Sequence, residues 1–177
     1  FTLLIFLLQC FTLFAGSFRP LSIKEGLSSR QVFQVSKDSA GFIWAYTHMG
    51  GDRYDGNEIK HYQLDETVAS KDHILSSTTM TCDYSGNIWI ALKNGKIYAY
   101  DNRTDAFQLR VDASGYLSSP VLNNILFDVD NRLWLCMSTG VYCWEEKSGL
   151  LLAGLKGQCV NCIVQIDDTE FCAGTNK

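Results

Sequence analysis

The stretch Asp38-Ser39-Ala40-Gly41-Phe42-Ile43-Trp44 (DSAGFIW) decides the fold, because the chain repeats its pattern twice. The copies are DYSGNIW at 83–89 and DVDNRLW at 128–134, each 45 residues after the one before. A glycine follows every copy at the same spacing. A fixed period of about 40–50 residues is typical of propellers and solenoids. The repeated positions are Asp38, Gly41, Trp44, Gly50, Asp83, Gly86, Trp89, Gly95, Asp128, Asn131, Trp134 and Gly140.

The residue types of this repeat predict a hairpin. An aspartate suits the first position of a tight turn, because its carboxylate accepts hydrogen bonds from backbone amides two residues on. The third residue after it is Gly41, Gly86 or Asn131, the types that most readily adopt positive φ. An apolar residue and a tryptophan then suit a half-buried strand. We therefore predict that each Asp-x-x-Gly/Asn segment is a turn between two strands of one small sheet.

Each repeat has room for four short strands, which in the second repeat we place at 79–83, 87–92, 97–101 and 106–111. A fourth repeat starts near 159, has Cys172 at the tryptophan position, and holds only two strands. The prediction is an all-β fold, a β-propeller fragment that forms an open arc of three complete four-stranded blades plus part of a fourth. The blades would span roughly 22–64, 73–111, 117–155 and 159–177, and we expect a further short strand at 18–22.

The first 17 residues differ from the rest of the chain. Residues 1–15 carry no charge, and the stretch ends in the small residues Ala15, Gly16 and Ser17. This is typical of the apolar and cleavage regions of a secretory signal peptide, and it is shorter than the roughly 20 apolar residues of a membrane span. We expect residues 1–17 to be a signal peptide that lacks its basic start, and the remainder to be exported to the periplasm.

Composition excludes several classes of partner and cofactor. The chain has 177 residues, 46% of them hydrophobic, and its 19 acids outnumber its 15 Lys and Arg. No basic patch indicates a nucleic-acid partner. Six cysteines lie outside the predicted signal, and Cys159-x-x-Cys162 lacks the second ligand pair of a zinc site. We expect free, buried thiols rather than a metal centre or cofactor, and the sequence leaves disulfide formation open.

No catalytic constellation stands out. The chain has no phosphate-binding loop, HExxH or GxSxG motif, so we predict no chemistry for it and name no catalytic or metal-binding residue. Asp128 and Asp130 share the spacing of a calcium loop, but the glycine and glutamate of such a loop are missing, which favours a simple turn. The repeated tryptophans have the aromatic surface to stack on sugars, yet their fixed place in each repeat favours packing between blades.

At these residues the chain resembles the two-component regulator propeller repeat. The match is densest over 26–62 and covers a GLSS entry, the Asp-x-x-Gly-x-Ile-Trp hairpin and an Arg-Tyr-Asp-Gly segment. Ala45-Tyr46 and Gly51 depart from the family pattern, and the later repeats keep less of it. The matching residues are Gly26, Leu27, Ser28, Ser29, Asp38, Gly41, Ile43, Trp44, Thr47, Gly50, Arg53, Tyr54, Asp55 and Gly56.

The resemblance implies an N-terminal fragment of the periplasmic sensor region of a hybrid two-component sensor histidine kinase of the Bacteroidetes type. Such receptors are anchored in the inner membrane, many sense an oligosaccharide, and the full receptor is expected to form a homodimer. The remaining blades of the same chain would be further partners. The resemblance does not indicate which residues contact the ligand. Two alternatives stay open: a secreted propeller enzyme, such as a polysaccharide lyase or glycoside hydrolase, and an extracellular protein-interaction propeller.

Overall fold

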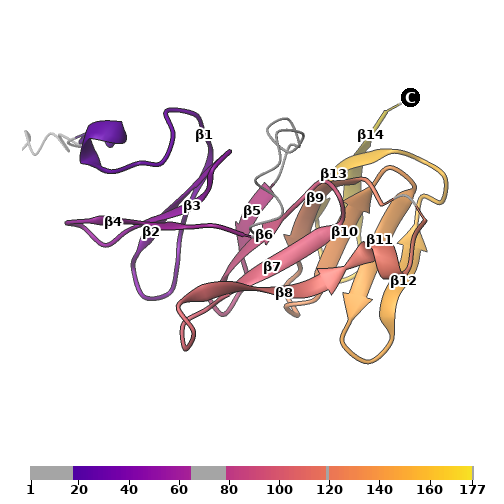
Figure 1. Cartoon of the computed structure of the whole chain (residues 1–177). Helices are drawn as coiled ribbons and strands as arrows, with labels where there is room; N and C mark the ends of the chain where they lie inside the picture. Colours follow the sequence, from indigo (N-terminus) through magenta and orange to yellow (C-terminus); the bar gives the residue numbers. More distant parts are fainter. Residues whose placement is uncertain (1–17, 65–78, 119, 177) are drawn as a thin grey trace, which may run out of the picture.

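The computed structural model describes residues 18–64, 79–118 and 120–176. The predicted signal peptide at 1–17 and the start of the predicted second blade at 73–78 lie outside these residues. The described chain forms three four-stranded antiparallel sheets and one two-stranded sheet, and within each sheet the spatial order of the strands follows the chain. The sheets do not close into a ring (Figure 1). The predicted fold class is therefore confirmed.

The first sheet contains β1 (Val32–Lys37), β2 (Ile43–Thr47), β3 (Gly50–Tyr54) and β4 (Ile59–Tyr62). The second contains β5 (Thr79–Cys82), β6 (Ile88–Ala91), β7 (Lys96–Asp101) and β8 (Ala106–Asp112), all within one residue of the predicted bounds. The third contains β9 (Leu122–Phe127), β10 (Leu133–Met137), β11 (Gly140–Glu145) and β12 (Gly149–Gly154). The last pairs β13 (Val160–Gln165) with β14 (Phe171–Thr175).

The strand expected at 18–22 is wrong. These residues enter a short 3-10 helix, η1 (Ile23–Glu25), without forming a strand. The reason is local: the Ser22 hydroxyl accepts the Lys24 amide, and the Glu25 carboxylate accepts the Ser22 amide at 2.7 Å. This capping box starts a helical turn where an extended segment was expected. A second 3-10 helix, η4 (Ala113–Gly115), follows β8. No helix in the part of the chain that the structure describes is long and apolar enough to cross a membrane.

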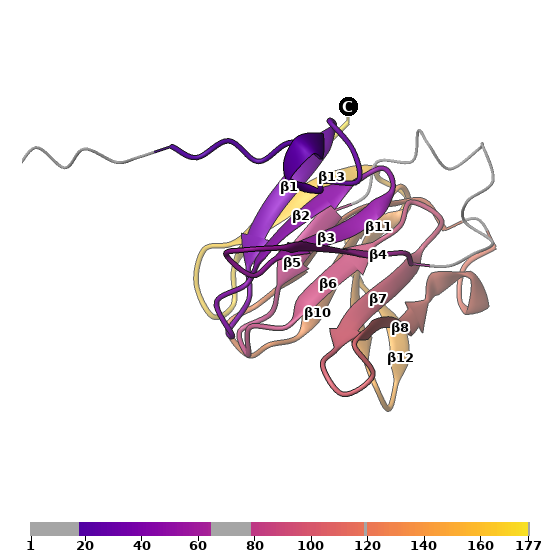
Figure 2. The same cartoon turned by 60° about the vertical axis from the view of Figure 1, so that its left-hand side comes forward.

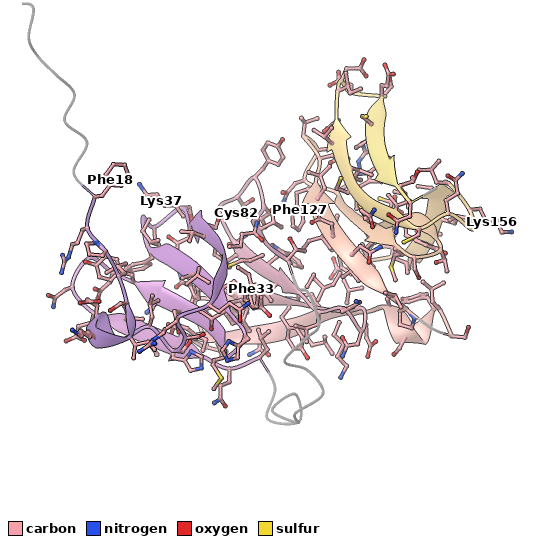
Figure 3. All side chains as sticks on the ribbon, turned by 90° about the horizontal axis from the view of Figure 1, so that it is seen from above. Phe18, Phe33, Lys37, Cys82, Phe127 and Lys156 are labelled. Atoms are coloured by element: carbon pink, nitrogen blue, oxygen red, sulfur yellow. The ribbon has the colours of Figure 1, made fainter. Side chains whose placement is uncertain are left out.

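The sheets stand side by side like the blades of a fan. The first strands of the sheets, β1, β5, β9 and β13, lie against one another along the inner edge. Lys37, Cys82 and Phe127, each the last residue of a first strand, follow one another across the fan in Figure 3. Figure 2, turned toward the first sheet, shows the sheets stacked behind one another. We call the interface between two neighbouring sheets a seam.

The hydrophobic core lies in the seams rather than inside any one sheet. Between the first two sheets, the fully buried Trp44 packs with Tyr62, Met80 and Ile90 among others. Between the second and third sheets, Ile97, Val111, Leu122 and Leu135 are among the buried residues. A smaller cluster around Cys136 and Val160 joins the third sheet to the last hairpin. Each sheet therefore needs a neighbour on both faces to complete its core.

Backbone geometry explains the repeated glycine positions. We call the turn between the first and second strands of each four-stranded sheet its first turn. In the first turns, Gly41, Gly86 and Asn131 have φ of +93°, +81° and +62°, as the sequence predicts. At the second turn of the first repeat, Gly50 has φ of +126°, and a Cβ there would lie 2.3 Å from the carbonyl oxygen of Tyr62. The glycine thus also makes room for the end of β4, which the sequence did not predict.

Candidate functional site

The repeated aspartate and tryptophan of each blade are directly bonded to each other. One carboxylate oxygen of the aspartate accepts a backbone amide four residues on and closes the turn. The other accepts the indole N–H, so one carboxylate fixes both the turn and the tryptophan ring. Sequence reasoning assigned only the turn. The indole nitrogen to carboxylate oxygen distances are 2.7 Å for Trp44–Asp38, 2.9 Å for Trp89–Asp83 and 2.8 Å for Trp134–Asp128.

Each tryptophan ring contacts an aromatic ring of the following sheet. Trp44 lies with its ring centroid 4.7 Å from that of Tyr100. Trp89 lies 5.1 Å from Phe127, and Trp134 lies 4.6 Å from Phe171. Aromatic rings at these separations attract one another beyond the effect of their burial. This is the packing between blades that the sequence predicts; Trp44 is fully buried in it, whereas Trp89 and Trp134 are half-buried.

The first turns also bond to one another across the seams. In all three, the amide of the residue after the aspartate donates to the next sheet: Ser39 N to Gly86 O at 3.1 Å, Tyr84 N to Asn131 Oδ1 at 2.9 Å, and Val129 N to Gln165 Oε1 at 2.9 Å. Asn131 is therefore more than a residue that tolerates positive φ. Its side-chain oxygen takes the place that the Gly86 carbonyl fills in the preceding seam.

The outer part of the first seam holds a group of charged and aromatic residues around Asp105, which we call the Asp105 cluster: Arg53, Lys60, Tyr62, Tyr100 and Asp105. Oδ1 of Asp105 accepts the Tyr62 hydroxyl at 2.7 Å and the Tyr100 hydroxyl at 2.6 Å. Arg53 Nη1 lies 3.5 Å from the same oxygen, and Lys60 Nζ donates to Oδ2. Four donors from two sheets thus converge on one carboxylate.

Electrostatics in the Asp105 cluster follow from these contacts. The hydrogen bonds from Lys60, Tyr100 and Tyr62 hold the pKa of Asp105 well below its ordinary value. Burial, and then the hydrogen bond to Asp105, raises the pKa of both Tyr62 and Tyr100, so the hydroxyls remain neutral donors. The cluster is therefore arranged to hold an ionised carboxylate and to shift no group toward proton transfer near neutral pH.

Arg53 connects this cluster to the core of the seam. Its guanidinium carbon lies 4.7 Å from the ring centroid of Phe42, 5.3 Å from Tyr62, 5.6 Å from Tyr100 and 5.8 Å from Trp44. Nη1 donates to the Tyr100 hydroxyl at 2.5 Å, and the side chain is only 18% exposed. A guanidinium among ring faces gains cation–π attraction that grows as water is excluded. This explains the arginine of the Arg-Tyr-Asp-Gly segment, whose role the sequence did not reveal.

A shallow hollow lies beside the Asp105 cluster, between the first turns of the first two sheets. Its lining includes Asp38, Gly86, Asn87, Tyr100 and Asn102. The two asparagine side chains and the tyrosine ring are groups that can bind polar ligands. The carboxylate of Asp38 is already bonded to Phe42 N and to the Trp44 indole.

A second polar group, around Asp52 in the middle of β3, explains the GLSS entry. Asp52, which is 1% exposed, accepts the Ser28 amide and hydroxyl, both at 2.9 Å, and His61 Nδ1 lies 2.8 Å from its Oδ1. The Ser28 hydroxyl also lies 2.9 Å from Thr47 Oγ1. Serine, aspartate and histidine meet here, but the carboxylate lies between the other two. Since the histidine does not reach the serine oxygen, this geometry fastens the entry segment and builds no nucleophile.

The residues considered for metal binding have protein partners. Arg132 Nε donates to Asp128 Oδ2 at 2.7 Å, and its Nη2 lies 3.2 Å from Asp130, so a guanidinium occupies the position that a calcium ion would need. Among residues 18–64, 79–118 and 120–176, no group of three or more His, Cys, Asp or Glu is placed to hold a metal.

The prediction of buried thiols is correct for Cys136 and wrong for two cysteines of the last hairpin. Cys162 and Cys172 are exposed, and the described cysteines are free thiols. Register explains the difference: Ile163 and Ala173 form one pair on the face that packs on the third sheet, while Val164 and Cys172 pair on the other face. No described sheet covers that face.

The structure has close counterparts among solved structures, whereas no protein-family model and no curated protein matches the sequence. One counterpart is the extracellular domain of a B. thetaiotaomicron protein described as a hybrid two-component system. It is 22% identical, with a TM-score of 0.68 over 88% of this chain and 23% of that one. Another, from a B. thetaiotaomicron protein described as a one-component system, is 16% identical, with a TM-score of 0.69 over 89% of this chain and 21% of that one.

The TM-scores show a shared fold at low sequence identity. The chain spans less than a quarter of the length of either counterpart. The resemblance inferred from the repeat motifs is thus matched by the three-dimensional arrangement of the blades. The chain has the fold of a segment of the extracellular domains of B. thetaiotaomicron two-component and one-component systems.

Proposed function

We propose that the chain belongs to the periplasmic ligand-sensing propeller region of a hybrid two-component receptor anchored in the inner membrane, and that the receptor senses an oligosaccharide. The observation that carries the proposal is the fold shared over 88% of this chain with the extracellular domain of a protein described as such a system. The GLSS, Asp-x-x-Gly-x-Ile-Trp and Arg-Tyr-Asp-Gly motifs support it independently. In this role the described residues bind and transmit, and perform no chemistry.

The repeated tryptophans are not the ligand contacts in this proposal. Trp44 is fully buried, and all three indoles are held by a carboxylate and by a ring of the next sheet. A sugar would have to displace that packing to stack on them. The turns at the ends of the sheets, which carry exposed polar side chains, are the better surface for an oligosaccharide.

Calorimetric titration of the full exported protein with a panel of oligosaccharides tests the function. We expect saturable binding of one oligosaccharide class. Trp89→Phe serves as the matched control: it keeps an aromatic ring in the seam and should lower the melting temperature without weakening the sugar affinity. Absence of binding across glycans of every charge and linkage class contradicts the proposal. Loss of affinity in Trp89→Phe at unchanged stability would instead place the ligand on the tryptophans.

The alternatives predict different results in the same samples. A polysaccharide lyase or glycoside hydrolase would release new chain ends during incubation, detected as unsaturated or reducing sugars. An extracellular protein-interaction propeller would bind no glycan and would capture a protein partner. In the proposed role, the glycan is recovered intact after binding.

A further inference from the structure

We propose that the Asp105 cluster is a charge latch, in which ion pairs and hydrogen bonds to the Asp105 carboxylate hold the first blade against the second. The stability of this seam then depends on whether a carboxylate occupies the Asp105 position. The proposal concerns the chain's own mechanics and does not depend on the identity of the ligand. It rests on contacts that join two sheets, on the backbone of the turn that carries Asp105, and on a comparison with the corresponding turn of the third blade.

The contacts of Asp105 run across the seam. Asp105 belongs to the turn between β7 and β8 of the second sheet, whereas Arg53, Lys60 and Tyr62 belong to β3 and β4 of the first. Tyr100, from its own sheet, donates to the same oxygen and accepts from Arg53. One turn of the second blade is thereby fastened to two strands of the first by charge-assisted hydrogen bonds, which are stronger than neutral ones.

The backbone conformation at position 105 indicates that an aspartate stands there because of its carboxylate, and not because the turn requires this residue type. Asp105 has φ of +49°, a conformation in which glycine is the favoured residue. The turn between β11 and β12 in the third blade ends in Gly149, with φ of +74°. There the Tyr116 ring, from the segment that links β8 to β9, lies against the glycine. The corresponding turn thus makes an uncharged contact in the third blade and a charged one in the second.

The attraction across the first seam depends on charged groups that solvent can reach, so dissolved ions can change its strength. Arg53 and Lys60 both approach Asp105, so removal of that carboxylate leaves two cations on one side of the seam and no acid between them. The Asp105 side chain is 42% exposed and that of Lys60 is 54% exposed. Dissolved ions therefore reach the cluster and weaken its attraction. A small soluble carboxylate could also take the place of the Asp105 side chain among the four donors.

Hydrogen–deuterium exchange of the full protein, read by mass spectrometry, tests the latch. In Asp105→Asn, which suits the positive φ but removes the charge, we expect the amides of β3 and β4 to exchange about tenfold faster, as the loss of one charge-assisted contact allows. The amides of β11 should not change. Asp101→Asn, which removes an acid paired with Arg103 in the same turn, is the matched control and should leave the first blade unaffected.

A rescue experiment separates the carboxylate from the turn. In Asp105→Gly the donors lose their occupant, and sodium acetate should restore the protection of β3 and β4 where sodium chloride of equal ionic strength does not. For the unaltered protein, rising sodium chloride should loosen the first blade selectively, a readout that needs no variant. Unchanged exchange of β3 and β4 in Asp105→Asn overturns the proposal. So does faster exchange spread evenly over all three sheets, or no selective effect of salt.

Discussion

Asp128 shows at the scale of one residue how a turn and a core are joined. Its carboxylate is fully buried and accepts the amides of Asp130 and Arg132, the Arg132 guanidinium and the Trp134 indole. These donors keep its pKa below the ordinary value although burial acts in the opposite direction. The buried charge is tolerated because hydrogen bonds to both carboxylate oxygens offset the cost of desolvation.

We expect Asp128→Ala to lower the free energy of unfolding by about 2–4 kcal/mol, because it leaves the half-buried Trp134 indole N–H and two turn amides without an acceptor. Asp130→Ala removes an exposed acid that pairs with Arg132 and should cost less than about 1 kcal/mol. Urea titrations of both variants measure the difference. Equal losses would mean that the buried carboxylate has no special role in the blade.

The cysteines differ in reactivity for a physical reason. Burial raises the pKa of the Cys136 thiol to about 12, whereas Cys162 and Cys172 are exposed. Because the thiolate is the reactive form, we expect iodoacetamide to label Cys162 and Cys172 in the folded protein and Cys136 only after unfolding. Peptide mapping with and without denaturant reads this out. Labelling of Cys136 at the rate of Cys172 under native conditions would show that the third seam is open in solution.

At the scale of the element, the hairpin is the unit that the sequence predicts best. The Asp-x-x-Gly/Asn turn and the alternation after it are local signals, so the strands of the second sheet lie within one residue of their expected bounds. The strand expected at 18–22 is wrong, because the capping box of Ser22 and Glu25 is an equally local signal and favours a helical turn.

The Asp105 cluster could not be read from the sequence. Arg53 and Asp105 are 52 residues apart, and neither belongs to a column that the repeats share. Asp105 looks like one polar residue of a polar turn until its φ and its neighbours across the seam are known. The same holds for Asp52, whose burial depends on a serine 24 residues away. Repeats predict what recurs in every blade, whereas a contact made in one seam alone leaves no periodic trace.

The close approach of the first turns makes a prediction at the same scale. Gly86 has φ of +81°, and a Cβ there would lie 2.3 Å from the Cβ of Ser39 in the preceding blade. Gly56→Ala is the matched control, since its φ is +102° and nothing lies within 4 Å. We expect Gly56→Ala to cost about 1–2 kcal/mol of backbone strain. Gly86→Ala should cost about 1–3 kcal/mol more, because it forces two blades apart.

Equal melting temperatures for these two alanine variants would contradict the seam contact. A lower melting temperature for Gly86→Ala that a second change, Ser39→Gly, partly restores would support it, because that change removes the atom that the new methyl group strikes. The pair thus separates the conformational cost of alanine from the cost of distance between blades.

At the scale of the whole molecule, the described blades form an open arc whose two end faces have no described neighbour. On the first strand, Val35 is 61% exposed and lies on the face opposite to Trp44 and Tyr46. On the last hairpin, Val164 is 57% exposed beside the exposed Cys172. Since the core of this fold lies in the seams, an uncovered end face exposes apolar side chains that a neighbouring blade would bury. Apolar end faces and the unpaired edge of β14 favour association with another copy.

We therefore expect residues 18–177, expressed alone, to associate or to be poorly soluble. Light scattering coupled to size-exclusion chromatography measures this. The double variant Val35→Lys with Val164→Lys places a charge on each end face and should raise the monomer fraction. Val129→Lys is the control, because Val129 is exposed in a turn of the third sheet, which has a described sheet on each side. If the unaltered segment instead runs as a monodisperse monomer that unfolds cooperatively, the two end faces are covered in solution, and the open arc of blades is not the state that the isolated segment adopts.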